Sequence, residues 1–293
     1  MALRMDPGKG AIDGPNEIQR SRIGVVGLGA VGKALAHTMS WFHDVVGFDI
    51  QGSYDWEPVL STSAVFVCVS TPEDSTGRLD CRNVDDVLKR LNLGHYSGLI
   101  IIRSTLRIGY MESAVRRFPN LRLVYSPEFL RERSRLQWSV NPDRLVLAGA
   151  PGDVEMVRKI FNWIQDAPTL VMSYKDAEIG KLAHNAFIAT KVSFTNEIEQ
   201  ICARCGADPD NVMKVVSSDR RVGSREHLRP GLGPYSGSCV PKDTRELLHA
   251  GGETTLLQAV EKVNDKLSNH AKASRAKHGT ESRGAAELIS DSP

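Results

Sequence analysis

The sequence lacks any long uninterrupted apolar run, and no stretch of its 293 residues approaches the roughly 18 apolar residues that a membrane-spanning helix needs. It also lacks an excess of charge of one sign. The 37 Lys and Arg stand against 35 Asp and Glu, and a formal net charge of +2 argues neither for nor against nucleic acid. The first residues, MALRMDPGKGAIDGPNEIQRSR, contain no apolar core of a secretory signal. We predict a cytoplasmic protein with no membrane segment, and, since no excess of positive charge indicates one, no nucleic-acid partner.

Cysteine is scarce and shows no framework spacing. The chain has five cysteines, an odd number, which favours a reducing compartment over a disulfide scaffold. Cys202 and Cys205 form a C-x-x-C, the spacing of a redox or metal pair, but they lie in a helical pattern that ends at Gly206. No second pair completes a zinc site, so we interpret these two thiols as inert and expect no metal.

What is present is an ordinary globular composition. Hydrophobic residues make up 41% of the chain and charged residues 25%, and the length suggests two domains. Up to about residue 172, apolar runs alternate with helical patterns, which predicts a parallel sheet covered by helices on both faces. The first predicted strand begins at Arg22, and the others span residues 44–50, 63–70, 98–105, 121–126 and 144–150.

The pattern changes in the second part of the chain. From Asp176 to about Cys205 the apolar residues keep helical spacing, interrupted only by Gly180, and predict one helix of ~30 residues, or ~45 Å. Shorter helices are predicted at 208–217, 243–250 and 254–268. The residues from 269 to 293 are polar without periodicity and predict a tail without regular structure.

A glycine-rich turn lies between the first predicted strand and the helix that follows it. Gly27, Gly29 and Gly32 form G-x-G-x-x-G, and Asp49 ends the next strand. In this context the glycines permit a tight turn and let the backbone and the helix N-terminus approach a pyrophosphate. Asp49 would bind the ribose 2′-hydroxyl and repel a 2′-phosphate, which favours NAD over NADP; the alternative is a purely structural turn.

These signals together predict an α/β protein. An N-terminal Rossmann-type, doubly wound parallel sheet is followed by an α-helical domain built on one long helix. Only thirteen residues, QGSYDWEPVLSTS, separate the second strand from the next apolar run, and Pro58 limits any helix there, so the adenine side is expected to be open. The expected division is a polar tail at 1–21, an NAD-binding domain at 22–172, a helical domain at 173–268, and the tail at 269–293.

One cysteine does not sit in an apolar run. Cys239 lies in the polar loop GSCVPKD, with Lys242 and Asp243 shortly after it. A neighbouring ammonium favours the thiolate form, so the pattern suggests a nucleophile. An inert thiol is the alternative.

Other polar residues recur at helical spacing, and one ends a predicted strand. Glu128 and Glu132 lie four residues apart in SPEFLRE, and Lys181 and Asn185 do the same in the long helix. Thr105 ends a predicted strand, at the sheet edge where ligands bind in doubly wound folds. For each pair the alternative is a solvated helix face. We interpret His184 as a packing or surface residue, and Lys191 and Glu197 are compatible with the surface.

Taken together, these stretches resemble the UDP-glucose/GDP-mannose 6-dehydrogenase family, in order, over about residues 22–268. The motifs are GVVGLGAVG, VSTP (69–72), RSTL (103–106), SPEFLRE (126–132), NPDRLVLAG (141–149), AEIGKLAHNAFIATKVSFTNE (177–197), GAD (206–208), DRRVG (219–223), PGLG (230–233), GSCVPKDT (237–244) and LLQAVEKVN (256–264).

The resemblance implies the oxidation of a primary alcohol to a carboxylic acid by two NAD⁺. It implies that Cys239 is the covalent nucleophile of the second oxidation. By resemblance, Lys181 and Asn185 stabilise the oxyanion at the reacting carbon. Asp243 and Glu128 are the candidate proton-transfer and water-activating carboxylates.

The remaining implied roles concern water, cofactor, substrate and the partner subunit. Thr105 would position the hydrolytic water, and the implied cofactor contacts are Thr71, Thr105 and Glu132. Arg221 would reach the substrate of the neighbouring subunit in a homodimer formed by the long helix. The implied substrate contacts further include Phe129, Leu130 and Gly237.

Three departures from the family pattern leave the substrate open. The resemblance ends before the family's third, UDP-binding domain, so contacts from that domain are expected to be missing. The loop PGLGPYSGSC carries one extra residue, and Ser126 replaces the usual asparagine. The alternatives are a sugar or nucleoside-like substrate other than a UDP-sugar, a conventional UDP-sugar, an oxidation that stops at the aldehyde, and an NAD-binding protein that turns nothing over.

Overall fold

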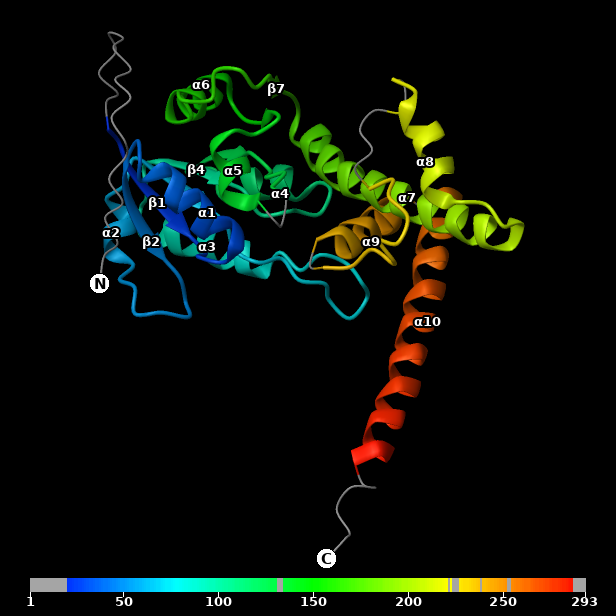
Figure 1. Ribbon diagram of the computed structural model, residues 1–293. Helices are drawn as coiled ribbons and strands as arrows, with labels where there is room; N and C mark the ends of the chain where they lie inside the picture. Colours follow the sequence, from blue (N-terminus) through cyan, green and yellow to red (C-terminus); the bar gives the residue numbers. More distant parts are fainter. Residues whose placement is uncertain are drawn as a thin grey trace, which may run out of the picture.

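The computed structural model describes residues 20–130, 134–220, 222, 227–237, 239–251 and 254–286. An α/β unit comes first in this part of the chain, and helices arranged around one long helix follow it (Figure 1). The predicted fold class, a doubly wound parallel sheet followed by a helical part, is confirmed.

The sheet has five parallel strands in the order β2-β1-β3-β4-β5. A short parallel pair, β6 and β7, is joined to β5 by an antiparallel bridge between Tyr125 and Ala148. The bounds are β1 Arg22–Val26, β2 Asp44–Phe48, β3 Ala64–Val67, β4 Leu99–Ile102, β5 Arg122–Tyr125, β6 Leu145–Leu147 and β7 Thr169–Val171.

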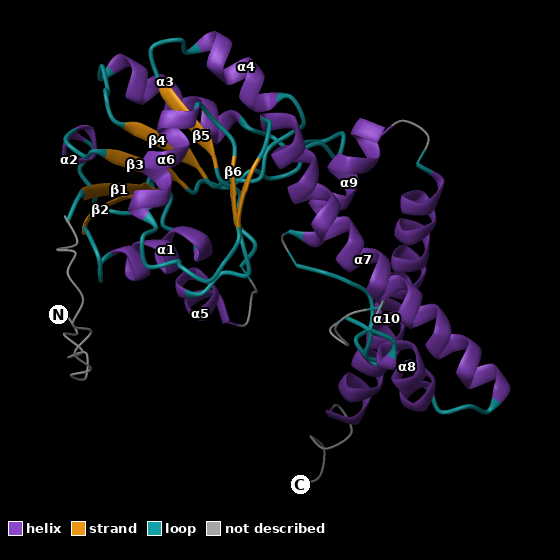
Figure 2. Cartoon of the chain, turned by 90° about the horizontal axis from the view of Figure 1, so that it is seen from above, coloured by secondary structure: helices purple, strands orange, loops and turns teal. Residues whose placement is uncertain are grey.

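The helices of the α/β unit cover both faces of this sheet, with α3 and α4 on one side and α1 on the other (Figure 2). Their bounds are α1 Ala30–Met39, α2 Glu57–Leu60, α3 Arg82–Leu93, α4 Tyr110–Arg117, α5 Arg135–Val140 and α6 Pro151–Ile160.

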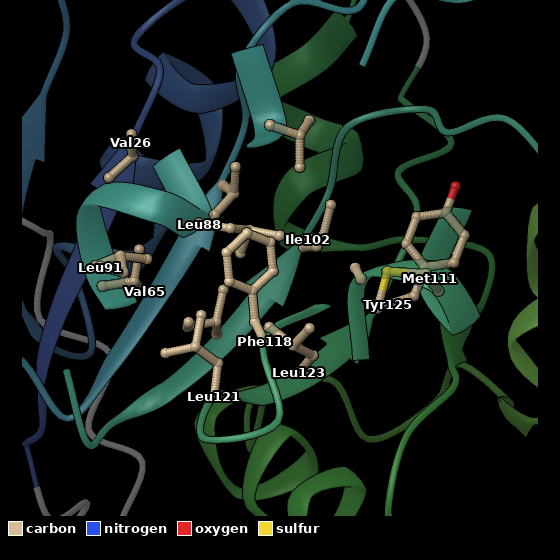
Figure 3. Packing of buried hydrophobic residues seen from close by; sticks show 14 of the residues in the cluster. Val26, Val65, Leu88, Leu91, Ile102, Met111, Phe118, Leu121, Leu123 and Tyr125 are labelled. Carbon is tan, nitrogen blue, oxygen red and sulfur yellow. The ribbon is translucent and has the colours of Figure 1, made fainter. Parts of the chain in front are cut away.

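Each central strand is buried on both faces because its side chains alternate between two apolar clusters. In β3, Val65 and Val67 face the cluster that includes α3 and α4, whereas Ala64 and Phe66 face the cluster of α1 and α6. Figure 3 shows the first cluster, in which strand residues such as Val65 gather with Leu88 and Leu91 of α3. Burial of each such Val, Ile or Phe side chain contributes about 1.5–3 kcal/mol, which explains the nearly continuous apolar runs in the sequence.

The connection from β2 to β3 is short, as the sequence predicts. It contains only α2, a single helical turn that includes Pro58. Trp56 packs edge-on against Phe48 at 4.9 Å between ring centroids, which fixes the connection to the sheet. β2 is therefore an edge strand of the five-stranded sheet, and Ile50 just beyond it is 87% exposed.

The long helix α7, Tyr174–Cys205, confirms the helix of ~30 residues that the apolar spacing predicts. The Ser173 hydroxyl caps its start by accepting a hydrogen bond from the Asp176 amide, and Gly206 ends it with a φ of +69°. Glu178, near the start, is fully buried and accepts hydrogen bonds from the amides of Gly109 and Met111 at 2.6 and 2.8 Å. These two bonds fasten the first turns of α7 to α4.

The remaining helices pack around α7. Both α9 and α10 contact it, and Val192 of α7 meets Val260 of α10 in a small apolar cluster with Tyr235. The bounds are α8 Pro209–Ser218, α9 Val240–Gly251 and α10 Thr255–Ala286. Across the described ranges, none of the helices is both long enough and apolar enough to cross a membrane.

The structure differs from the sequence analysis at two elements. β7 was not predicted, because it has only three residues and none of them is buried. The tail expected from residue 269 is wrong for its first part, since α10 continues to Ala286. Residues 272–286 contain good helix formers and no proline, so propensity favours a helix even where no apolar stripe predicts a packed one. Residues 287–293 and most of the predicted N-terminal tail lie outside the described ranges.

Candidate functional site

The glycine turn between β1 and α1 can be built only from glycines at two positions. Gly27 has a φ of +93°, and a Cβ on it would lie 2.7 Å from the carbonyl carbon of Cys68. A Cβ on Gly32 would lie 1.8 Å from the carbonyl oxygen of Gly27. Gly29, by contrast, has open space above it. The turn therefore packs tightly against β3 on one side and leaves its other side accessible.

The start of α1 fits a pyrophosphate. Gly29 is its N-cap, no side chain in the described residues caps it, and its first turn carries no acidic residue. The backbone amides there are free to donate, and the helix dipole adds a partial positive charge. This is the arrangement that a dinucleotide needs.

Asp49 lies beside this turn. Its Oδ2 accepts a hydrogen bond from the Leu28 amide at 2.6 Å, and its Oδ1 accepts one from the Gln51 amide at 2.8 Å. The carboxylate thus ties the end of β2 to the glycine turn, and carboxylate oxygens keep further lone pairs for a ribose hydroxyl.

The ends of β3 and β4 are tied together by side chains. The Thr71 hydroxyl donates to the carbonyl oxygen of Thr105 at 2.8 Å, and the Ser104 hydroxyl donates to that of Val69 at 2.6 Å. Thr71 and Thr105 are both buried. The two predicted threonines therefore lie together at the carboxyl edge of the sheet, where doubly wound folds bind ligands.

Lys181 and Asn185 lie one turn apart on α7, and both are buried, at 3% and 6% exposure. The Lys181 ammonium donates to the backbone carbonyl of Glu128 at 2.7 Å and lies 3.5 Å from its Oε1. The solvated-helix-face alternative is therefore wrong for this pair. A buried ammonium needs such partners, because an unpaired buried charge is costly.

Glu128 is held ionised by its neighbours. Burial alone would raise the pKa of Glu128, but the Lys181 ammonium, the Leu130 amide and the Arg103 guanidinium outweigh burial and hold that pKa below its usual value. The Leu130 amide donates to Oε2 at 2.6 Å. Glu128 is thus a carboxylate acceptor at the centre of the site.

A second carboxylate joins the site from α9. Asp243 is fully buried, and its Oδ2 accepts a hydrogen bond from Nδ2 of Asn185 at 2.6 Å. Its Oδ1 accepts one from Lys242 at 2.7 Å. Lys242 is thus engaged with Asp243. Asn185 keeps a second N–H and Lys181 has further donors, so both can still bind an oxyanion.

Cys239 comes immediately before α9 and is exposed. Its carbonyl oxygen accepts the Asp243 amide at 3.0 Å, which closes the first turn of the helix. Gly237, two residues earlier, has a φ of +90°, a conformation that favours glycine. The thiol therefore sits at a helix N-terminus, where the helix dipole stabilises an anion, one turn from the buried carboxylate.

Phe129, one of the expected substrate residues, lies beside Lys181. The Phe129 ring lies between the Arg144 guanidinium, 4.0 Å from its centroid, and the Lys181 ammonium at 5.2 Å. The His184 ring meets Phe129 edge-on at 5.2 Å, and its Nδ1 lies 3.0 Å from Oδ1 of Asn185. Leu130 and Phe129 also line a small cavity, together with Arg103, Trp138 and Leu145.

Two charged residues of this region were not among the predicted site residues. Arg103 donates from Nη1 to the Ser126 hydroxyl at 2.9 Å, and burial lowers its pKa, although its charge still acts on Glu128. Arg144 packs on Phe129, and burial lowers its pKa too. The signal for Arg103 was its place in RSTL, two residues before Thr105; that for Arg144 was the motif NPDRLVLAG.

Glu132 and Arg221 lie outside the described residues. Cys202 is buried and Cys205 exposed. Throughout the described chain, no group of three or more His, Cys, Asp or Glu could hold a metal ion.

The geometry thus combines a dinucleotide turn, buried carboxylates, buried ammonium and amide donors, and a thiol. Comparison with known proteins agrees. The model of the NAD binding domain of the UDP-glucose/GDP-mannose dehydrogenase family matches residues 50–165, and the model of its central domain matches residues 175–266. The fold and site define a dinucleotide-binding protein with a helical second domain. The chain belongs to the UDP-glucose/GDP-mannose dehydrogenase family, and NAD is its cofactor.

Individual relatives point the same way. The UDP-glucose 6-dehydrogenase TuaD of Bacillus subtilis is 34% identical over 225 residues, covering 72% of this chain and 48% of that protein. The UDP-glucose 6-dehydrogenase of Pseudomonas aeruginosa is 32% identical, covering 71% and 49%. A solved UDP-glucose dehydrogenase from Pyrobaculum islandicum superimposes with a TM-score of 0.78 at 29% identity, covering 88% of this chain and 70% of that one. The chain spans about half the length of the curated relatives that it matches.

The glycine turn gives a first prediction. Gly32→Ala should lower the free energy of unfolding by roughly 1–3 kcal/mol, because the added Cβ would clash with the Gly27 carbonyl oxygen. It should also weaken NADH binding about tenfold or more. Gly29→Ala should leave the melting temperature unchanged and weaken only the binding of NADH. Thermal denaturation and NADH fluorescence titration measure both. A Gly32→Ala variant that matches the wild type in both would contradict the assigned role of the turn.

Glu128 gives a prediction on pH. Its pKa is lowered in the folded state, so the stability it contributes is present above the ordinary carboxyl pKa of about 4.3 and is lost as pH falls through the folded-state pKa. Glu128→Gln should cost about 3–5 kcal/mol near pH 7, because Lys181 loses its buried counter-charge. The cost should shrink in acid, measured by melting temperature against pH. The exposed Glu155→Gln on α6 is the control; a cost independent of pH would refute the charge pairing.

Proposed function

We propose that this protein is an NAD-dependent oxidoreductase that oxidises the primary alcohol of a nucleotide sugar to the carboxylate. One observation carries the proposal: Lys181 and Asn185, on one face of α7, bond Glu128 from the edge of the sheet and Asp243 from α9. This brings donors, two carboxylates and the helix that follows Cys239 to one place.

The residues that would hold the cofactor are the glycine turn, the start of α1, Asp49 and the tied threonines Thr71 and Thr105. A further implied cofactor contact, Glu132, belongs to the proposal by resemblance. When bound, NAD⁺ accepts the hydride that leaves the substrate carbon in each of two oxidations.

The first oxidation removes a hydride from the alcohol carbon and a proton from its hydroxyl, giving an aldehyde. We assign the removal of that proton to Asp243 or Glu128, the two carboxylates bonded to Asn185 and Lys181. Negative charge develops on the substrate oxygen as the proton leaves. Lys181 and Asn185 hold donors toward this charge from a buried face, where each such donor is worth about 3–4 kcal/mol in the transition state.

The second oxidation needs a nucleophile, since an aldehyde has no hydroxyl proton to give up. The sulfur of Cys239 forms a bond to the aldehyde carbon, and the carbonyl oxygen takes up a proton, giving a thiohemiacetal. Loss of a second hydride and of that proton leaves a thioester. Lys181 and Asn185 stabilise the negative charge on the oxygen in this addition, and again when water later attacks the thioester.

Hydrolysis completes the reaction. A water molecule, deprotonated by Glu128 or Asp243 and positioned by Thr105, attacks the thioester carbon. The carbon–sulfur bond breaks, the carboxylic acid leaves, and the Cys239 thiol is restored. Each turnover therefore consumes one alcohol, one water and two NAD⁺.

The substrate class rests on the family and its relatives. The relatives named above are UDP-glucose dehydrogenases, and the aromatic and cationic wall of Phe129 and Arg144 beside Lys181 suits a polar, anionic sugar derivative. By resemblance, Leu130 and Gly237 are further substrate contacts, and Arg221 reaches the substrate of the neighbouring subunit.

The assembly we propose is a homodimer through α7. Three exposed apolar residues, Phe187, Phe194 and Ile201, recur every seven residues along one stripe of this helix. A heptad spacing of this kind suits packing against a second helix. In a dimer of this kind the stripe would be covered by its own copy.

The chemistry is tested by product analysis with Cys239→Ser. Wild-type protein offered UDP-glucose, GDP-mannose and other sugars or nucleosides with free primary hydroxyls should form two NADH per acid, measured by absorbance and mass spectrometry. Cys239→Ser should form no thioester and make acid at least about a hundredfold more slowly, because the covalent step is lost. Cys205→Ser, also exposed, is the matched control.

The outcomes separate the alternatives. Acid formed by Cys239→Ser at the wild-type rate contradicts the covalent mechanism. One NADH per aldehyde in the wild type means that oxidation stops early. No turnover of any compound with NADH binding intact means an NAD-binding protein without this activity.

The dimer is tested with Phe194→Glu, which should convert it to a monomer because two carboxylates would face each other in the apolar interface. Light scattering after size exclusion measures the mass, and Leu93→Glu, at an exposed position of α3, is the control. A wild-type monomer, or a Phe194→Glu dimer, would refute this interface.

A further inference from the structure

The segment between β3 and α3 forms a small hairpin, residues 72–80, immediately after Thr71. Glu73 and Leu79 face each other in an antiparallel bridge. The Asp80 amide donates to the Pro72 carbonyl at 2.7 Å, and the Asp74 amide donates to that of Arg78 at 2.8 Å. In Figure 1 this loop reaches from the sheet to the underside of α9.

The hairpin is braced from inside. The Asp74 carboxylate accepts hydrogen bonds from the Thr76 amide and hydroxyl at 2.8 and 2.6 Å and from the Arg78 amide at 3.1 Å. These bonds lower the pKa of Asp74, so it keeps its charge. The two strands of the hairpin are therefore held together as one unit.

Two neighbouring residues of α9 hold opposite strands of this hairpin. Arg245 makes a two-pronged pair with Glu73, at 2.6 and 2.8 Å. Glu246 accepts the Leu79 amide at 2.7 Å. Because Glu73 and Leu79 are the bridge partners, the Arg245–Glu246 clamp grips the hairpin across its width.

The second half of the clamp is unusual in its burial. Glu246 is fully buried, and its Oε1 has no hydrogen-bond partner among the described residues; the nearest cation there, Arg78, is 3.8 Å away. Burial raises the pKa of Glu246. A buried carboxylate left half satisfied costs stability, so packing alone does not explain its presence.

Arg245, the first residue of the clamp, is also linked to the loop that carries Cys239. Arg245 lies 3.6 Å from Glu261 of α10, which accepts the Tyr235 hydroxyl at 2.7 Å. Tyr235 is buried and lies four residues before Cys239. One chain of contacts thus runs from the hairpin, through α9 and α10, to the loop that delivers the thiol.

We propose that Arg245 and Glu246 are positioning residues that set the cofactor edge of the sheet against the helix start that carries Cys239 and Asp243. The clamped hairpin begins one residue after Thr71, whose hydroxyl is tied to Thr105. The clamping residues follow Asp243 by two and three positions on the same helix. The inference rests on the proposed function for the roles of Cys239 and Asp243.

A merely structural clamp would lower the melting temperature and nothing else. If the clamp positions α9, cofactor binding at the sheet should also stabilise the backbone of α9. NADH binding should then slow amide exchange in residues 240–251 as well as in residues 71–81, although α9 itself supplies no expected cofactor contact.

The experiment compares hydrogen exchange with and without NADH in the wild type, Arg245→Ala, Glu246→Ala, Glu246→Gln and the control Glu155→Ala on α6. The wild type and control should show slower exchange in both segments. The two clamp alanine variants should keep slowing at 71–81 and lose it at 240–251, with the Kd for NADH within about threefold of wild type. Glu246→Gln, which keeps an oxygen for the Leu79 amide, should keep part of the effect.

The inference is overturned if NADH fails to slow exchange at 240–251 in the wild type, or slows it equally in both alanine variants. These readings need no turnover, so they stand even if the substrate panel is inactive and the proposed function fails. With an active substrate, kcat of the alanine variants should fall about tenfold to a hundredfold, as expected of misplaced reacting groups. Unchanged kcat in both variants would also overturn the inference.

Discussion

The buried ammonium of Lys181 is the charge on which the site depends. It is only 3% exposed, so it must be compensated, and Glu128 supplies both a backbone carbonyl and a carboxylate for this. That requirement fixes the loop after β5 against α7. One turn further along, Asn185 donates a hydrogen bond to Asp243, which holds α9 against the same face of α7. Thus three segments far apart in sequence meet because charged and polar groups on one helix face cannot be left without partners.

Local signals in the sequence predict most of the fold. Apolar runs of β-branched residues predict β1 to β6, because strands buried on both faces need apolar side chains at every position. The spacing along α7 predicts its length to within two residues. The misses have the same cause. β7 is short and not buried, and the later turns of α10 show no apolar stripe, so neither element leaves a periodic signal.

The site was predictable as a set of residues but not as a set of contacts. Gly27, Asp49 and Cys239 stand out through motif and context. The bonds that organise them are long-range: Asn185 meets Asp243 across 58 residues, and Arg245 meets Glu73 across 172. No pattern along a single sequence reports such pairs. Lys242 illustrates the limit, since its place near Cys239 suggests a partner for the thiol, whereas its ammonium bonds Asp243.

One glycine of α7 shows what keeps Lys181 and Asn185 in place. Glu178 fastens the first turns of the helix to α4, and Gly180, the only glycine in α7, lies two residues further on, just before Lys181. Glycine is the weakest point of a helix, because it lacks a side chain to restrict its backbone. Lys181, immediately after it, is bound to Glu128 in the loop that follows β5. The ~48 Å helix is therefore anchored to the α/β unit on both sides of its weakest residue, so that side-chain anchors, and not the stiffness of the helix alone, set the distance from the glycine turn to Lys181 and Asn185.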